Sequence, residues 1–290
     1  MNIRNKIIAT AVGALSLCGT ATASFAGSEI QPGISAGLPI GAPLPEGLYV
    51  IELPNYGYRN SVPGQSVGAI VPAWTIWSTP WTLLGGRVLF DVATPIANVN
   101  VHGVFNRGGL ANPLVEAQLK WDLGNGFFGG FHAGAYLPIR DDVTLLEIAH
   151  NYASFQGIAA LSYLKDGWNL SGTFMFGNGQ SGSALIPGSW GTSYYNLDLT
   201  ATKQFGGFEI GAVAFSSADL SSPFAGYAKQ SQFAAGGLIG YHFANHVSIQ
   251  FKLTRDVTET NYGGYDTRGW ANVIIPLWAP TPAPVVAAKY

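Results

Sequence analysis

The residues best suited to contact a solute are charged and amide side chains that recur every second position. Glu116, Gln118 and Lys120 alternate with apolar residues, as do Gln250 and Lys252. A spacing of two puts side chains on one face of a β-strand. The residues predicted to line an inner face are Arg87, Asp91, Glu116, Gln118, Lys120, Met175, Asp198, Gln250, Lys252, Arg268 and Trp270. Their mixed charges do not predict strong ion selectivity. Stiffening of the protein by side-chain ladders is an alternative role to solute contact.

The histidines do not indicate catalysis or metal binding. They are His102, His132, His150, His242 and His246, and none stands in a metal-ligand pair or a nucleophile motif. We therefore predict no catalytic residue, no metal and no cofactor. His150 or His242 could still meet a serine and an acid in space, so a lipase-like or esterase-like enzyme remains an alternative function, as does a structural barrel.

The elements that would position these side chains are strands with two different faces. In the segment 247–257, Val247, Ile249, Phe251 and Leu253 alternate with polar residues. A sheet with one apolar and one polar face can span a bilayer if it closes on itself, because lipid cannot satisfy free backbone groups. The pattern predicts an all-β, transmembrane antiparallel β-barrel of about 12 strands over residues 47–278.

The connections between these strands alternate in length. Short turns are expected at 78–80, 124–126, 165–167, 206–207 and 244–245, and long connections at 56–66, 140–151, 177–193, 217–229 and 258–265. Outer-membrane barrels have short periplasmic turns and longer extracellular loops. This order predicts an outer-membrane protein with both termini in the periplasm.

Composition agrees with a barrel. Of the 290 residues, 48% are hydrophobic and 10% charged, well below the roughly 25% charged of soluble domains. A formal net charge of -2 argues against nucleic acid as a partner. The expected partners are outer-membrane lipid, the barrel-assembly machinery and a small hydrophobic or aromatic solute. A secreted β-sandwich is the alternative.

The two ends of the chain differ from the barrel region. Residues 1–26 have the order of a signal peptide: Arg4 and Lys6, then an apolar stretch, then small residues. Cys18, the only cysteine, lies there, and a lipoprotein signal around it is a second interpretation. The Pro/Gly-rich segment 27–46 is predicted to plug the lumen, with a disordered periplasmic leader as the alternative. The Pro-rich tail 279–290 either hangs in the periplasm or contributes to insertion.

Several short motifs together resemble a known family. They are Gln31-Pro-Gly33, Pro43-Leu-Pro-Glu-Gly-Leu-Tyr-Val50, Gly109-Leu-Ala-Asn-Pro-Leu114, Leu119-Lys-Trp121, Ala135-Tyr-Leu-Pro138, Tyr194-Tyr-Asn-Leu-Asp-Leu-Thr200, Lys203-Gln-Phe-Gly206 and Glu209-Ile-Gly211. In this order they resemble the MetA-pathway of phenol degradation family of outer-membrane transporters, over nearly all of the mature chain. Ala111-Asn112 stands where the family usually has Gly-Asp. The resemblance implies passage of hydrophobic or aromatic compounds across the outer membrane.

Overall fold

The computed structural model describes residues 28–140, 152–179, 192–222 and 226–280. Within these ranges, no helix is long and apolar enough to cross a membrane. The predicted signal peptide and most of the predicted tail lie outside the described residues. The strands are β1 (Gly47–Glu52), β2 (Asn55–Arg59), β3 (Gln65–Ile70), β4 (Trp74–Leu83), β5 (Gly86–Ala93), β6 (Ile96–Val101), β7 (Phe105–Leu110), β8 (Leu114–Gly124), β9 (Phe127–Tyr136), β10 (Ser154–Lys165), β11 (Trp168–Gly179), β12 (Ser193–Phe205), β13 (Phe208–Asp219), β14 (Ser231–His242), β15 (Ser248–Thr260) and β16 (Asp266–Trp278).

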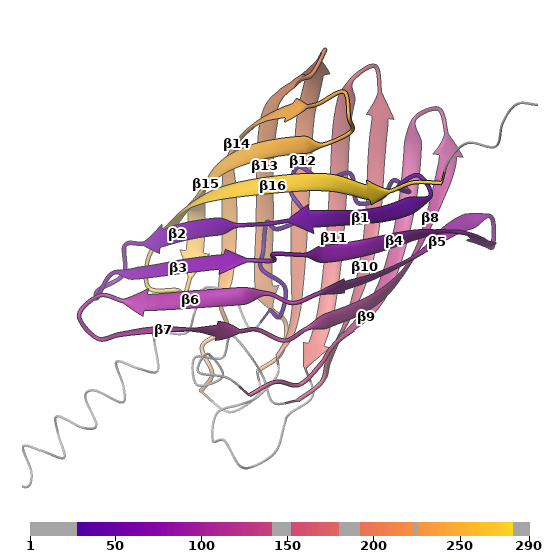
Figure 1. Cartoon of the computed structure of the whole chain (residues 1–290). Coiled ribbons are helices and arrows are strands. Elements are labelled where there is room, and N and C mark those ends of the chain that lie inside the picture. Colours follow the sequence, from indigo (N-terminus) through magenta and orange to yellow (C-terminus); the bar gives the residue numbers. More distant parts are fainter. Residues whose placement is uncertain (1–27, 141–151, 180–191, 223–225, 281–290) are drawn as a thin grey trace, which may run out of the picture.

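The strands form one antiparallel barrel. The order β1-β4-β5-β8-β9 continues through β10 to β16, and β16 pairs back onto β1, with Leu48 opposite Trp278. The ring therefore closes with twelve strands, and the prediction of an antiparallel barrel of about 12 strands is confirmed. Figure 1 shows the strands curving into a closed wall.

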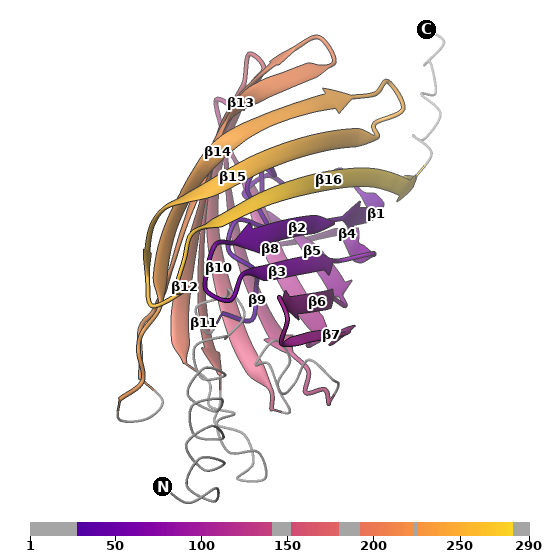
Figure 2. The ribbon, with the colours of Figure 1, turned by 90° about the vertical axis from the view of Figure 1, so that its left-hand side faces the viewer.

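Prolines interrupt four of the twelve strands. Pro54, Pro72, Pro95 and Pro113 lie between β1 and β2, β3 and β4, β5 and β6, and β7 and β8. Proline has no N–H for the ladder, so it breaks the pairing and bends the strand. The four bends lie side by side in the wall. Beyond them, β16-β2-β3-β6-β7 continue the sheet, and β7 pairs with β6 alone among the described strands (Figure 2).

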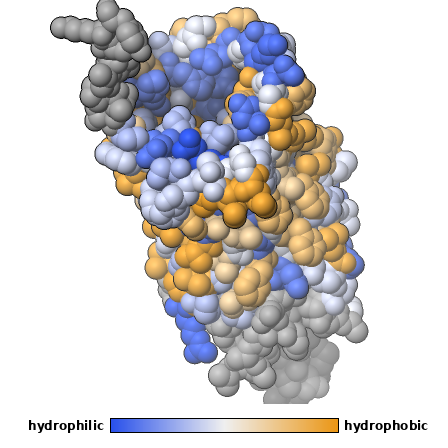
Figure 3. All heavy atoms as spheres, turned by 90° about the vertical axis from the view of Figure 1, so that its right-hand side faces the viewer, coloured by the Kyte–Doolittle hydropathy of each residue, from blue (hydrophilic) through white to orange (hydrophobic). Residues whose placement is uncertain are grey.

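The two faces of the wall differ as the sequence predicts. In β15, Gln250 and Lys252 are buried in the interior, whereas Phe251 and Leu253 are 56% and 63% exposed on the outside. Hydrophobic residues cover much of the outer wall, and hydrophilic residues gather in the hollow at one end (Figure 3). An apolar outside and a polar inside suit a barrel embedded in lipid.

Tight turns lie at one end of the barrel, which we call the tight-turn end; the opposite end is the long-loop end. Asn125 and Asp166 adopt φ of 55° and 52° in two of these turns, as short hairpins require. Aromatic rings flank the turns: Phe127 lies 4.8 Å from Tyr163, and Phe208 lies 4.9 Å from Tyr241, centroid to centroid.

Two predicted connections are wrong. Residues 78–80 are not a turn but part of β4, where the register with β5 shifts between Ser78 and Thr82; the turn follows at Leu84 and Gly85. The predicted connection 56–66 contains most of β2 and the start of β3. In both places a Pro or Gly within a bent strand resembles the signal for a turn.

Candidate functional site

The barrel interior is occupied by residues 28–46, which we call the inner segment (Figure 1). Asp198 of β12 accepts three hydrogen bonds from it: from the backbone N–H of Gly33 and of Ser35, both at 2.9 Å, and from the Ser35 hydroxyl at 2.7 Å. Lys252 of β15 donates to the carbonyls of Gly33 at 3.1 Å and Ala36 at 2.7 Å. An acid and a base on different strands therefore hold the same turn of backbone.

Amide and hydroxyl side chains hold the rest of the segment. Gly37 donates to Thr200 Oγ1 at 2.7 Å, and its carbonyl accepts from Gln250 at 3.1 Å. Gly37 has φ of 94°, and a Cβ there would lie 2.7 Å from Leu238 Cδ1. Only glycine fits this conformation and this approach without strain. The segment also contributes apolar side chains to the interior, since Leu38 and Ile40 pack with the core of β1, β4 and β5.

A cavity of about 100 Å³ lies between the inner segment and the wall. Its apolar lining comes from the inner segment, the four strand bends and the opposite wall: Ile30, Ile34, Ile40, Leu53, Ile70, Val71, Trp74, Ala93, Pro95, Ala97, Ala111, Leu114, Ile158 and Met175. An apolar cavity of about 150 Å³ engineered in another protein binds benzene. The bends thus help to form a space that approaches this volume.

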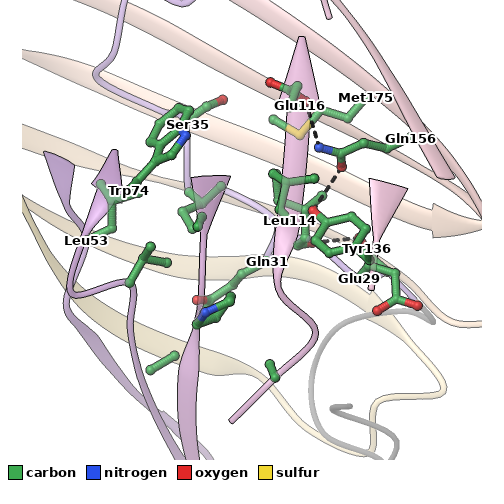
Figure 4. A pocket seen from close by; sticks show the side chains of 18 of the residues that line it. Glu29, Gln31, Ser35, Leu53, Trp74, Leu114, Glu116, Tyr136, Gln156 and Met175 are labelled. Carbon is green, nitrogen blue, oxygen red and sulfur yellow. Dashed lines mark hydrogen bonds between the residues drawn. The ribbon is translucent and has the colours of Figure 1, made fainter. Parts of the chain in front are cut away.

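One side of the cavity is polar. Glu116 accepts a hydrogen bond from Gln156 Nε2 at 3.1 Å, and Tyr136 donates to Gln156 Oε1 at 3.0 Å (Figure 4). The other Glu116 oxygen lies 2.7 Å from Nδ1 of His132. Glu29 of the inner segment lies near this group, and burial raises the pKa of Glu29 to about 8. The cavity therefore offers an apolar body and a hydrogen-bonding end to one small molecule.

A second acidic group lies beside the first. Asp91 accepts hydrogen bonds from Trp74 Nε1 at 2.7 Å and from Gln118 Nε2 at 2.5 Å. Lys120, 5% exposed, interacts electrostatically with both Asp91 and Glu116. Strands β4, β5, β8, β9 and β10 thus share one buried polar network.

All but one of the residues predicted to line the inner face fall into three groups. Asp91, Glu116, Gln118, Lys120 and Met175 lie in or beside the cavity lining. Asp198, Gln250 and Lys252 contact the inner segment. Arg268 and Trp270 pack together near the bends, with the guanidinium carbon 5.7 Å from the ring centroid. Arg87 lies apart, half-buried at the tight-turn end, where it donates to the carbonyl of Thr79 at 2.9 Å. A role of these residues in transport remains a prediction.

Sequence reasoning missed most of the polar end of the cavity. His132, Tyr136 and Gln156 alternate with outward-facing Phe131, Ala135 and Phe155, so the same two-residue spacing could have identified them. Nothing in the sequence indicates that these side chains meet Glu116. Trp74 begins β4 just after the Pro72 bend, and nothing in the sequence indicates that its indole meets Asp91.

One arrangement bears on the enzymatic alternative. His242 Nδ1 lies 2.8 Å from Ser248 Oγ, and His242 Nε2 lies 2.8 Å from Glu209 Oε2. Glu209 also accepts from Gln250 at 2.9 Å. A hydroxyl, an imidazole and a carboxylate in this order are the parts of an activated nucleophile. Ser248 is only 9% exposed, and Gln250 ties the group to the inner segment. In the part of the chain that is described, no cluster of side chains could hold a metal ion.

Solved structures with this fold include outer-membrane proteins. The COG4313 outer membrane channel from Pseudomonas putida F1 is 15% identical, with a TM-score of 0.62, and the match covers 81% of this chain and 97% of the channel. A FadL homologue from Pseudomonas aeruginosa is 9% identical over 85% of this chain and 98% of its own, with a TM-score of 0.45, too distant to support an argument. The first match places the chain in the fold of outer-membrane barrels.

Sequence comparison gives the family. None of the curated proteins matches the chain. The model of one family matches residues 59–273, which include most of the barrel and the cavity-lining residues from Ala69 to Met175. The chain therefore belongs to the family described as "Putative MetA-pathway of phenol degradation".

Proposed function

We propose that this protein is an integral outer-membrane channel for small hydrophobic or aromatic compounds. The observation that supports this best is the apolar cavity of about 100 Å³ with one hydrogen-bonding end. Ligand sites are typically apolar hollows with a few placed polar groups. The family description, which refers to phenol degradation, agrees with a ring-sized solute.

The inner segment acts as a plug in this proposal. It forms one wall of the cavity through Ile30, Gln31 and Ile34, and it is bound to several strands across the interior. A twelve-stranded barrel lies between filled eight-stranded barrels and open porins of sixteen or more strands. A solute in the cavity therefore leaves toward the tight-turn end only when the inner segment moves.

The remaining features follow the usual plan of such barrels. We propose that residues 1–26 are removed on export, that the barrel-assembly machinery inserts the mature chain, and that the tight-turn end faces the periplasm. Gly47 and Trp278 both lie at that end of the barrel. This orientation places the start of β1 and the end of β16 on the periplasmic side, whereas Ser28, which contacts Asn196 near the long-loop end of β12, lies toward the outer side.

Filling the cavity should block passage without unfolding the barrel. Ala97 is 4% exposed and lines the cavity from β6. In Ala97→Phe we expect uptake of benzyl alcohol into proteoliposomes to fall at least tenfold, because the added ring occupies the space that the solute needs. Overpacking of a core typically costs about 1–3 kcal/mol, so the barrel should remain heat-modifiable on gels.

The matched control is Ala133→Phe, since Ala133 is exposed on the outer face of β9. It should leave uptake unchanged. Equal uptake by Ala97→Phe and the parent would refute the cavity as the solute site. Hydrolysis of an aromatic ester by the parent, lost in Ser248→Ala, would instead favour the second candidate function, that of an esterase built on Ser248, His242 and Glu209.

A further inference from the structure

Arg59, at the long-loop end of β2, is buried with its hydrogen-bond donors unused. The residue is 2% exposed, and none of its three guanidinium nitrogens has a hydrogen-bond acceptor among the described residues. Gln65 lies directly opposite Arg59 in the β2–β3 ladder, is 4% exposed, and has an unused amide nitrogen within the same part of the chain. Side chains directly opposite in a ladder lie close together. Two neighbouring donor groups therefore point into the interior without acceptors.

The nearby acidic side chains are already engaged. Asp266 and Asp256 are the carboxylates that act electrostatically on Arg59. Asp266 Oδ2 accepts from Arg268 Nε at 2.9 Å, and Asp256 Oδ2 accepts from the backbone N–H of Asp266 at 2.7 Å. Each contact engages one carboxylate oxygen, and although Asp266 lies directly opposite Arg59 in the β16–β2 ladder, neither acid accepts a hydrogen bond from Arg59. They lower the net positive charge around Arg59 without satisfying its N–H groups.

Another neighbour of Arg59 is an aromatic ring. The Arg59 guanidinium carbon lies 4.4 Å from the centroid of Tyr262, in the connection between β15 and β16. A ring stacked on a guanidinium covers its face and leaves its N–H edge available. That edge matches the two oxygens of a carboxylate, which arginine binds with paired hydrogen bonds.

We propose that Arg59 and Gln65 form a binding site for the carboxylate of a small aromatic acid. Leaving buried donors unsatisfied typically costs about 1–3 kcal/mol per group, more for a charged one, so an anion bound there removes an existing penalty. The groups without partners on Arg59 and Gln65 are hydrogen-bond donors, and an incoming carboxylate offers only acceptors. A neutral solute gains little at this position.

A chain of hydrogen bonds leads to the cavity from Arg268, which shares the neighbour Asp266 with Arg59. Arg268 donates to Asn55 Oδ1 at 2.7 Å, and Asn55 exchanges two hydrogen bonds with Gln31 at 2.8 and 3.0 Å. Asn55 and Gln31 both line the cavity. The inference rests on the proposed function: the carboxylate site receives the acid at the long-loop end, above the cavity that accepts its ring.

The test compares benzoate with benzyl alcohol, its neutral counterpart, in proteoliposome uptake. In Arg59→Gln we expect the half-saturating concentration of benzoate to rise about tenfold or more, as expected for losing a charged hydrogen bond. Uptake of benzyl alcohol should stay within about twofold of the parent. Arg59→Lys keeps the charge but loses the paired hydrogen bonds, so it should give an intermediate value.

Arg255→Gln is the matched control, because Arg255 is exposed on the outer face of β15, where it contacts Thr267. This variant removes the same charge and should change the uptake of neither benzoate nor benzyl alcohol. Unchanged benzoate uptake in Arg59→Gln would overturn the carboxylate site and leave the channel proposal intact. If the parent protein takes up no benzyl alcohol, the channel proposal itself is overturned. If Arg59→Gln does not fold, as judged by heat-modifiability, Arg59→Lys decides the question. Benzoate uptake by Arg59→Lys equal to that of the parent would overturn the carboxylate site.

Discussion

Replacing Asp198 by alanine should release the inner segment from the barrel interior. The change removes the acceptor of three hydrogen bonds to Gly33 and Ser35, and it leaves the buried Lys252 ammonium without the carboxylate that acts on it. Breaking a buried charge arrangement on one side typically costs about 3–5 kcal/mol. We expect proteinase K to cleave the refolded barrel rapidly within residues 28–46, and uptake of small solutes to rise.

The control for this prediction is Asp122→Ala. Asp122 is exposed at a tight turn. Among the described residues, its carboxylate accepts a hydrogen bond from the backbone N–H of Gly124 and from no other group. It should leave both cleavage and uptake at the parental level. An Asp198→Ala barrel that folds and still protects the inner segment would show that Asp198 does not anchor it.

Placing arginine on the outer face of β15 should impair the barrel strongly. Phe251 is 56% exposed, and it lies between Ile249, which pairs with the aromatic Tyr241, and the outward-facing Arg255. This position is within the apolar band. An arginine on the lipid face near the midplane typically costs about 2–4 kcal/mol. We expect Phe251→Arg to lower the urea midpoint of unfolding in lipid vesicles and to reduce the heat-modifiable fraction.

Phe251→Leu keeps an apolar side chain at the same position and should unfold close to the parental midpoint. A parental midpoint for Phe251→Arg would mean that this face of β15 does not meet lipid. The register of β15 with β14 and β16 would then need to be reassigned, since a shift of one residue exchanges the two faces of a strand.

The sequence predicts the second half of the barrel better than the first. From β10 onward, uninterrupted alternation of apolar and polar residues indicates strands close to those observed, as for Ser248–Thr260. In the first half, Pro54, Pro72, Pro95 and Pro113 interrupt four strands that nevertheless continue. Local turn signals cannot distinguish a bend in a strand from its end, because only the neighbouring strands keep the chain extended.

The sequence predicts only part of the candidate site. Two-residue spacing identifies Glu116 and Met175 as inward-facing, but it does not reveal which inward-facing side chains meet. The cavity depends on four bends coming together and on the inner segment crossing opposite them, and both are products of long-range pairing. The contacts of Asp198 with residues more than 160 positions earlier in the chain have no signature in either local sequence.

The most direct test of the account is to lock the inner segment and measure flux. Asn196 Nδ2 lies 2.9 Å from Ser28 Oγ, and the other end of the segment continues into β1, so a link between positions 28 and 196 fixes both ends. The only cysteine of the chain is Cys18, so a refolded chain without residues 1–26 carries only the two introduced thiols of Ser28→Cys with Asn196→Cys. After reaction with a short, reducible thiol cross-linker, uptake of benzyl alcohol into proteoliposomes should fall at least tenfold and return on reduction. Uptake that is equal in the cross-linked and reduced barrels would contradict a channel whose passage requires the inner segment to move.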